Sequence, residues 1–450
     1  MTEPRKLLRD LGPWQSAALV VGTIIGTGVF LKTAVMAQRG GSPEWVLAAW
    51  AVGGVLSLAG ALTYAELGAM FPQAGGEYVY LREGYGRYAA FLYGWTRFWV
   101  GSPGSIAAYA VGAATFLSGV LPVEAMGGTQ VVGIVLIVVF TALGCLAVST
   151  GGRVQAALTV LKVVLICGLA FGALAAARGG SWGHLASRGG FPGWSAFGLM
   201  VLGALWAFDG WNNLPMAAGE IRDPQRNLPR ALILGSLAVL AIYTLVNLAY
   251  FYALPWEAVV TSSSTAYPQA PPVAARAAAT FLGDVTQGLV ACAMALSALS
   301  AMNGSILTNA RVPYAMAADG LAPGALARLS ARSVPVHAVI VQGLASCALA
   351  LSGRFDQITD SVIFASWLFY GMNAGSVVIL RLRHPEAPRP YRVPGFPVVP
   401  ALFIALSILL LGNTLISAPR ESLVGVGFVI LSLPAYLLFF RATSGARRLP

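Results

Sequence analysis

Residues 22–30 read GTIIGTGVF and lie within an apolar run that extends from about residue 14 to residue 37. Glycine destabilises the interior of a helix, so this stretch predicts an interruption in a helix that is otherwise long enough to cross a membrane. A second apolar run, at about 195–219, contains WAFDGWNN at residues 206–213. An aspartate at the centre of a membrane span costs about 2.5–3.5 kcal/mol. Two interrupted spans of this kind indicate a functional site.

The composition indicates that lipid is the main solvent of this chain. Of 450 residues, 57% are hydrophobic and 10% are charged, whereas about 25% are charged in a typical soluble domain. A helix needs roughly 20 apolar residues to cross the hydrocarbon core. Twelve windows of this kind predict an all-α polytopic membrane protein with about twelve transmembrane helices. They lie at about 14–37, 45–70, 88–118, 130–149, 153–177, 195–219, 231–254, 281–312, 335–352, 358–382, 396–417 and 422–440. The outer segment at about 255–280, rich in Ser and Pro, is expected to be a flexible loop.

The distribution of basic residues predicts the orientation in the membrane. With the N-terminus inside, the inner segments hold about three times as many Lys and Arg residues as the outer segments, as the positive-inside rule requires. Both termini are therefore expected in the cytoplasm, in a cytoplasmic (inner) membrane, and no cleavable signal is visible. The net charge of +11 does not indicate a nucleic-acid partner, because the basic residues occur singly and not in one patch with aromatic residues.

The two interruptions occupy corresponding places if windows one to five and six to ten are two halves of a repeat. Such a pair is typical of a transporter site at the membrane midplane. A broken helix exposes N–H groups at the start of one half and C=O groups at the end of the other, with opposite partial charges. An amino-acid zwitterion can bind to both. The alternative is that Gly22 and Gly26 only pack two helices closely; no strand precedes them, which excludes a dinucleotide-binding loop.

Other functions would need features that the sequence lacks. A multi-span membrane enzyme remains a remote alternative, since there is no HExxH motif, paired-Asp motif or phosphate loop, and a channel would need a continuous polar stripe. No metal or other cofactor is expected. The potential ligands are isolated in loops, at span edges or inside apolar runs, where the cysteines serve as small hydrophobic residues: His184, His337, His384, Cys145, Cys167, Cys292 and Cys347.

The charges inside the apolar windows differ in what they predict. Lys162 lies in the middle of the run 156–175 and is expected to act as a fixed cation or a titrating group, the alternative being that it reaches an interface. Arg97 and Arg311 are expected to be structural. Glu66 either holds a helix end or belongs to a cytoplasmic gate.

The residues also resemble a known family. GTIIGTGVF is similar to the first-helix signature of the L-amino-acid transporter group in the amino acid–polyamine–organocation superfamily. Further motifs in the same order are YAELG at 64–68, FP at 71–72, GGEY at 75–78, DPQRNLP at 223–229 and NGS at 303–305, followed by Arg311. The resemblance extends from about residue 12 to residue 440.

This resemblance implies a LeuT-type fold, in which two inverted five-helix repeats are followed by two C-terminal helices. The expected division is a cytoplasmic tail at 1–12, the repeats at 13–177 and 195–382, two helices at 396–440 and a cytoplasmic tail at 441–450. It also implies sodium-independent secondary transport of neutral L-amino acids by alternating access.

Site residues follow from the resemblance position by position. It implies that the substrate carboxylate meets the backbone of Ile25, Gly26, Thr27 and Gly28, and that the ammonium meets carbonyls of Ile24, Trp206 and Asp209. Trp206 falls where the family has an aromatic gate, and Lys162 falls where sodium-coupled relatives bind a cation. The remaining substrate-binding residues are expected to be Ala207, Phe208 and Gly210 in the second break, and Ala301 and Ser305 on the eighth span.

Some points stay open at this stage. Exchange is expected, with proton-coupled symport as the alternative, and the expected partner is a small or branched neutral L-amino acid. The role of the Asp209 side chain is undecided. Animal members pair with an accessory glycoprotein through a cysteine between spans three and four; residues 121–130 contain no cysteine, so no such disulfide-linked partner is expected.

Overall fold

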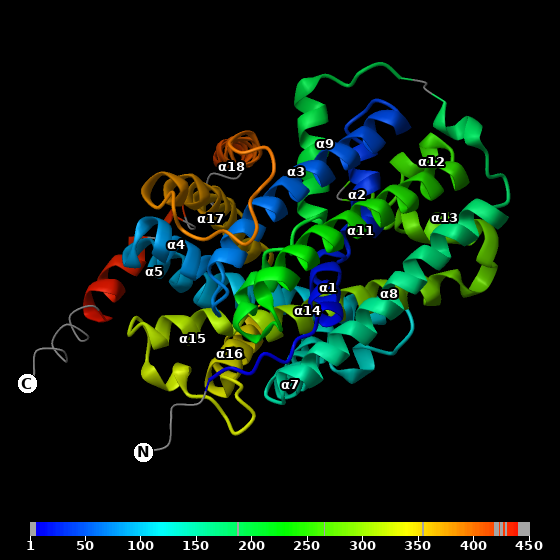
Figure 1. The fold of residues 1–450 in the computed structure, drawn as a ribbon. Coiled ribbons are helices and arrows are strands. Elements are labelled where there is room, and N and C mark those ends of the chain that lie inside the picture. The colour runs from blue at the N-terminus through cyan, green and yellow to red at the C-terminus, as the bar shows by residue number, and fades with distance from the viewer. Residues whose placement is uncertain are drawn as a thin grey trace, which may run out of the picture.

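The computed structural model describes residues 6–186, 189–264, 266–352, 355–417, 423, 426–427 and 430–439, with the side chains of 284 and 355–365 left out. Within this part the chain is a bundle of helices, drawn in Figure 1, and the one β-bridge joins Leu11 to Ile221. The predicted tail at 441–450 and parts of the last predicted window lie outside the described residues.

The bundle is built from the following helices. In chain order they are α1 (Pro13–Ile24), α2 (Gly28–Ala37), α3 (Pro43–Met70), α4 (Glu77–Tyr85), α5 (Arg87–Thr96), the π-helix η1 (Arg97–Gly101), α6 (Ser102–Leu117), η2 (Glu124–Met126), α7 (Gly128–Gly144), α8 (Val148–Ala176), η3 (Trp182–Leu185), α9 (Trp194–Ala207), α10 (Asn213–Met216), η4 (Ala218–Glu220), α11 (Pro224–Ala253), α12 (Trp256–Val260), α13 (Val273–Leu282), η5 (Gly283–Val285), α14 (Thr286–Asn309), α15 (Arg311–Ala318), η6 (Gly324–Ala327), α16 (Val336–Ser352), α17 (Phe355–Arg383) and α18 (Val398–Ser417).

The predicted windows correspond to helices in the structure. Seven helical segments of the described chain are long and apolar enough to cross a membrane. The other windows coincide with α7, α9, α16, α17 and the helical residues 430–439. Both predicted interruptions are confirmed: the first window is divided at residues 25–27, between α1 and α2, and the sixth at residues 208–212, between α9 and α10.

The structure differs from three of the predicted segments. The segment at 255–280 is not a plain flexible loop, because it contains α12 and α13, each with a proline at its N-cap. In the window expected at 281–312, the apolar span begins with α14 at Thr286, after α13 and η5, and α15 continues it to Ala318. The fifth span begins at Val148 and not at residue 153, so Arg153 is an exposed residue of α8.

The first helix occupies the centre of the bundle. Helix α1 packs against α8, α11 and α14, and α3 packs against α9 and α11. Small residues allow these approaches: a Cβ atom added to Gly235 of α11 would lie 2.6 Å from Val20 of α1. Close backbone contact through small residues is how helices associate in lipid, where the hydrophobic effect does not drive helices together.

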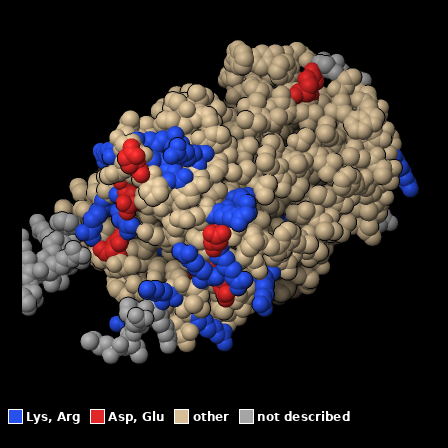
Figure 2. Space-filling view, viewed as in Figure 1, with Lys and Arg blue, Asp and Glu red and all other residues tan. Residues whose placement is uncertain are grey.

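One end of the bundle is closed by charged contacts, which we call the charged end. It is formed by three ion pairs, each joining different elements: Glu66–Arg381 at 2.6 Å, Arg82–Asp319 at 2.7 Å and Glu220–Arg311 at 2.7 Å. Figure 2 shows Lys and Arg, with fewer Asp and Glu, gathered over the region of α4, α15 and α17, while most of the rest of this face carries neither. The structural expectation for Arg311 is confirmed.

The segment that precedes α1 belongs to the charged end. The Leu11 N–H donates to the Glu220 carbonyl at 2.9 Å, and the Arg222 N–H donates to the Leu11 carbonyl at 2.9 Å. Glu66 also accepts a hydrogen bond from the Val393 N–H at 2.7 Å. The start of α1 is thus joined to the connector that follows the sixth span, and the connector that follows the tenth span is joined to α3.

The Glu220–Arg311 pair predicts a large difference between two variants. Both side chains are fully buried, so Glu220→Gln leaves a buried guanidinium unpaired, at a cost of about 3–5 kcal/mol. Asp10→Asn removes the exposed pair with Arg222, which is worth about 0–1 kcal/mol. Thermal unfolding of the detergent-solubilised protein should therefore show a much lower Tm for Glu220→Gln than for Asp10→Asn. Equal Tm values would contradict the structural role of the buried pair.

Candidate functional site

The two helix breaks lie against each other. Thr23, in the last turn of α1, donates its hydroxyl to the Gly210 carbonyl at 2.9 Å. Gly210 has φ of +124°, and a Cβ atom there would lie 2.5 Å from the Thr23 carbonyl oxygen, so only glycine fits. The Tyr243 hydroxyl of α11 lies within hydrogen-bond distance of the carbonyls of Ile24, at 3.3 Å, and Ala207, at 3.0 Å. One side chain thus contacts the ends of both α1 and α9.

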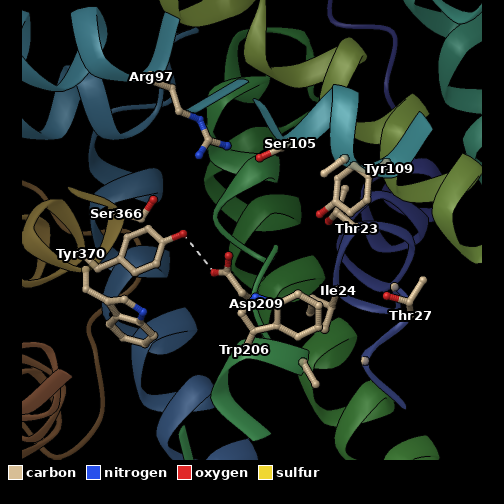
Figure 3. A pocket seen from close by; sticks show the side chains of 15 residues that line it. Thr23, Ile24, Thr27, Arg97, Ser105, Tyr109, Trp206, Asp209, Ser366 and Tyr370 are labelled. Atoms are coloured by element: carbon tan, nitrogen blue, oxygen red, sulfur yellow. Dashed lines mark hydrogen bonds between the residues drawn. The ribbon is translucent and has the colours of Figure 1, made fainter. Parts of the chain in front are cut away.

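A cavity of about 150 Å³ lies beside these breaks. In Figure 3, Asp209, Trp206 and Ile24 lie on one side of it, and Arg97 and Tyr370 on the other. The lining residues come from four parts of the chain: Thr23, Ile24, Gly26, Thr27 and Gly28 at the first break; Trp206, Ala207 and Asp209 at the second; Arg97, Ser105, Ala108 and Tyr109 on η1 and α6; and Ser366, Trp367 and Tyr370 on α17.

The glycines of the first break have separate roles. A Cβ atom at Gly22 would lie 2.0 Å from the Gln155 amide nitrogen, and one at Gly28 would lie 2.7 Å from the Ala207 Cβ. Both glycines therefore allow close helix packing. A Cβ atom at Gly26 would meet nothing nearer than the Ile24 carbonyl oxygen at 4.0 Å. The packing alternative thus holds for Gly22, whereas Gly26 lies in open space at the cavity.

The structure brings seven of the predicted site residues to the cavity and leaves five away from its lining. Those at the cavity are Ile24, Gly26, Thr27, Gly28, Trp206, Ala207 and Asp209. Ile25 is buried, Phe208 packs against the rings of Trp50 and Tyr243, and Gly210 is engaged with Thr23.

Ala301 and Ser305 are also buried away from the cavity, on α14. The physical reason is close packing, because a Cβ atom at Gly304 would lie 2.5 Å from the Thr23 methyl carbon. Helix α14 approaches α1 so closely that no space remains between them at this level.

Sequence reasoning did not identify the opposite wall of the cavity. Its polar residues occur as Ser105 with Tyr109, and Ser366 with Tyr370, on α6 and α17. Residues four apart share one face of a helix, so polar pairs at this spacing inside apolar windows were a usable signal. Arg97 is structural as expected, since it donates to Asn213 and Asn309 at 2.9 Å, but it lines the cavity as well.

Lys162 is held by the end of the first helix. Its side chain is fully buried, and Nζ donates to the carbonyls of Gly22 and Ile25, each at 2.6 Å. Carbonyls at a helix C-terminus carry partial negative charge, so the ammonium stabilises the broken end of α1. The alternative that Lys162 reaches a membrane interface is therefore wrong.

The remaining contacts concern Tyr370 and Trp206. The Tyr370 hydroxyl donates to the Asp209 carboxylate at 3.0 Å, the dashed line in Figure 3. Trp206 is 44% exposed, and the Lys32 ammonium lies 4.3 Å from the centroid of its ring.

In the described residues no group of His, Cys, Asp and Glu could hold a metal ion, and the four cysteines are free. The site is suited to binding a small polar molecule.

Comparison with known proteins gives the family. The profile of a family described as amino acid permease matches residues 11–440. The serine/threonine exchanger SteT of Bacillus subtilis (strain 168) is 32% identical, over 97% of this chain and 98% of its own. The b(0,+)-type amino acid transporter 1 of Mus musculus is 31% identical, over 96% and 88%. The large neutral amino acids transporter small subunit 2 of Mus musculus is 29% identical, over 96% and 81%.

These matches cover the whole bundle and both breaks. They confirm the resemblance drawn from the sequence motifs and the LeuT-type fold that it implied, and they assign the chain to transporters and not to membrane enzymes. The chain belongs to the amino acid permease family of multi-span membrane transporters.

Proposed function

We propose that this chain exchanges small neutral L-amino acids across the cytoplasmic membrane without sodium. The observation that carries this proposal is the pair of facing helix breaks that enclose one small cavity. The charged end faces the cytoplasm, with both termini, because Lys and Arg are retained on that side. The names of the relatives, among them an exchanger of serine and threonine, support exchange over proton-coupled symport.

The backbone at the breaks supplies both poles that an amino acid needs. Helix α2 begins without a side chain that caps its first turn, so N–H groups near Thr27 and Gly28 are available to a carboxylate. The Trp206 carbonyl, in the last turn of α9, carries partial negative charge, which suits an ammonium group, whereas the Ala207 carbonyl is already within hydrogen-bond distance of the Tyr243 hydroxyl. Both termini line the same cavity, so a single zwitterion can bind both.

The size of the cavity supports a small substrate. A cavity of roughly 150 Å³ in another protein admits benzene, which is in the size class of alanine, serine and threonine. The indole of Trp206 and the ring of Tyr370 occupy space that a larger side chain would require. The proposed substrates are therefore small neutral amino acids.

Lys162 supports the absence of sodium coupling. Its ammonium is held by two carbonyls at the end of α1, where a bound cation would otherwise be needed to stabilise them. The positive charge is covalently part of α8, so it is present in every transport cycle. We also propose that the carrier acts without a disulfide-linked accessory subunit, because residues 118–127, between α6 and α7, contain no cysteine.

Exchange predicts a dependence on internal substrate. In proteoliposomes that contain the purified protein, uptake of labelled L-serine should rise strongly when the vesicles are preloaded with L-serine or L-alanine. Replacing external sodium by choline should leave the rate unchanged, as should an imposed pH gradient. Concentrative uptake into empty vesicles that follows the pH gradient would establish proton symport instead, and an absolute need for sodium would contradict the role given to Lys162.

Replacement of Lys162 predicts a loss of turnover. Lys162→Ala leaves two buried carbonyls without their donor, and a hydrogen bond to a charged group is worth about 1.5–3 kcal/mol, so exchange should fall by roughly tenfold or more. The matched control is Arg153→Ala, because Arg153 is an exposed cation on the same helix. The exchange rate and the yield of monodisperse protein are measured for both variants. A Lys162→Ala protein with full exchange activity would remove this residue from the mechanism.

A further inference from the structure

Two opposite charges line the same small cavity. Asp209 follows α9, and Arg97 begins η1 on the opposite wall (Figure 3). They form no salt bridge with each other in the described structure. Instead, Arg97 is held by the amide oxygens of Asn213 and Asn309, and Asp209 is held by the Tyr370 hydroxyl. Neutral partners thus hold the two charges on separate walls.

Both charged groups keep hydrogen-bonding capacity toward the cavity. A guanidinium has five N–H donors, and a carboxylate has about four acceptor positions. Arg97 uses Nε and Nη2 for its amide partners, and no partner within the described residues is found for Nη1. Asp209 accepts from one side chain, Tyr370. A bound molecule therefore meets a donor on one wall and an acceptor on the other.

This arrangement discriminates between classes of side chain. A cationic side chain would be attracted by Asp209 and repelled by Arg97, and an anionic side chain would be repelled by Asp209 and attracted by Arg97. For either kind of charged substrate, the attraction and the repulsion largely offset each other at short range. An apolar side chain would displace water from the donor and acceptor positions of Arg97 and Asp209 that the protein does not satisfy, which is costly. A hydroxyl or carboxamide both donates and accepts, so it can satisfy Asp209 and Arg97 together.

We propose that Arg97 and Asp209 act as a balanced pair that selects small amino acids with an uncharged polar side chain, above all a hydroxyl. This inference rests on the proposed function and assigns a substrate class to the same cavity. Removing one member of the pair leaves a net charge in the cavity and should change the class of substrate, and not only the rate.

The test uses four probes of similar size: L-serine, L-alanine, L-aspartate and L-2,3-diaminopropionate. Each competes with labelled L-serine for exchange in proteoliposomes, or with labelled L-alanine where serine exchange is lost. The wild-type protein should prefer serine to the other three. Asp209→Asn should weaken competition by serine about tenfold and strengthen competition by aspartate, because the positive charge of Arg97 is then no longer offset. Arg97→Gln should instead strengthen competition by diaminopropionate, because the negative charge of Asp209 then remains. Arg153→Gln, which removes an exposed charge outside the cavity, should keep the wild-type order.

The outcomes separate the two proposals. If the wild-type protein exchanges no amino acid, the proposed function fails and this inference fails with it. If it exchanges serine and alanine equally, and Asp209→Asn keeps the same order of probes, the balanced pair is overturned while the proposed function stands. Asp209→Asn is the deciding variant, because Arg97 also holds Asn213 and Asn309 and its loss affects packing.

Discussion

A backbone that leaves its helical path inside a membrane exposes N–H and C=O groups that lipid cannot satisfy. In this chain most of the exposed carbonyls have a specific donor. Lys162 binds those of Gly22 and Ile25, Thr23 binds that of Gly210, and Tyr243 lies against those of Ile24 and Ala207. The uncapped first turn of α2 remains. The breaks are therefore stable because protein side chains donate to most of the exposed carbonyls. They can bind a ligand because the backbone groups that remain without a side-chain partner face the cavity.

The same contacts connect the cavity with the charged end. Helix α1 begins next to Leu11, which pairs with Glu220 and Arg222, and it ends at the carbonyls that Lys162 holds. The connector after the second break leads within a few residues to Glu220, whose carboxylate binds Arg311. Leu11 and this connector are thus joined at the charged end by two backbone hydrogen bonds. The connector is covalently continuous with the second break, so the charged end and the site share one short segment of chain.

The sequence predicts a feature of the site where a single residue is unfavourable in its own helix. It does not predict which helices pack against each other. Three glycines and Asp209 conflict with an apolar helix, so both breaks were predictable. The polar pairs that include Ser105 and Tyr370 mark one face of α6 and one face of α17, but their spacing does not show that the two faces line the same cavity. Ala301 and Ser305 do not line the cavity of this structure, because close packing at Gly304 is a property of the assembled bundle. The helices at 255–280 were missed, although Pro255 and Pro272 start them, as proline often does.

The central claim is that the two breaks bind opposite poles of one molecule. The most direct test is an experimental structure of the protein with bound L-serine, at a resolution that places the carboxylate and the ammonium. The account predicts the carboxylate within hydrogen-bond distance of backbone N–H groups at residues 26–28, and the ammonium against the carbonyls at the end of α9. A serine bound elsewhere, or continuous first and sixth helices with no cavity between them, would contradict it.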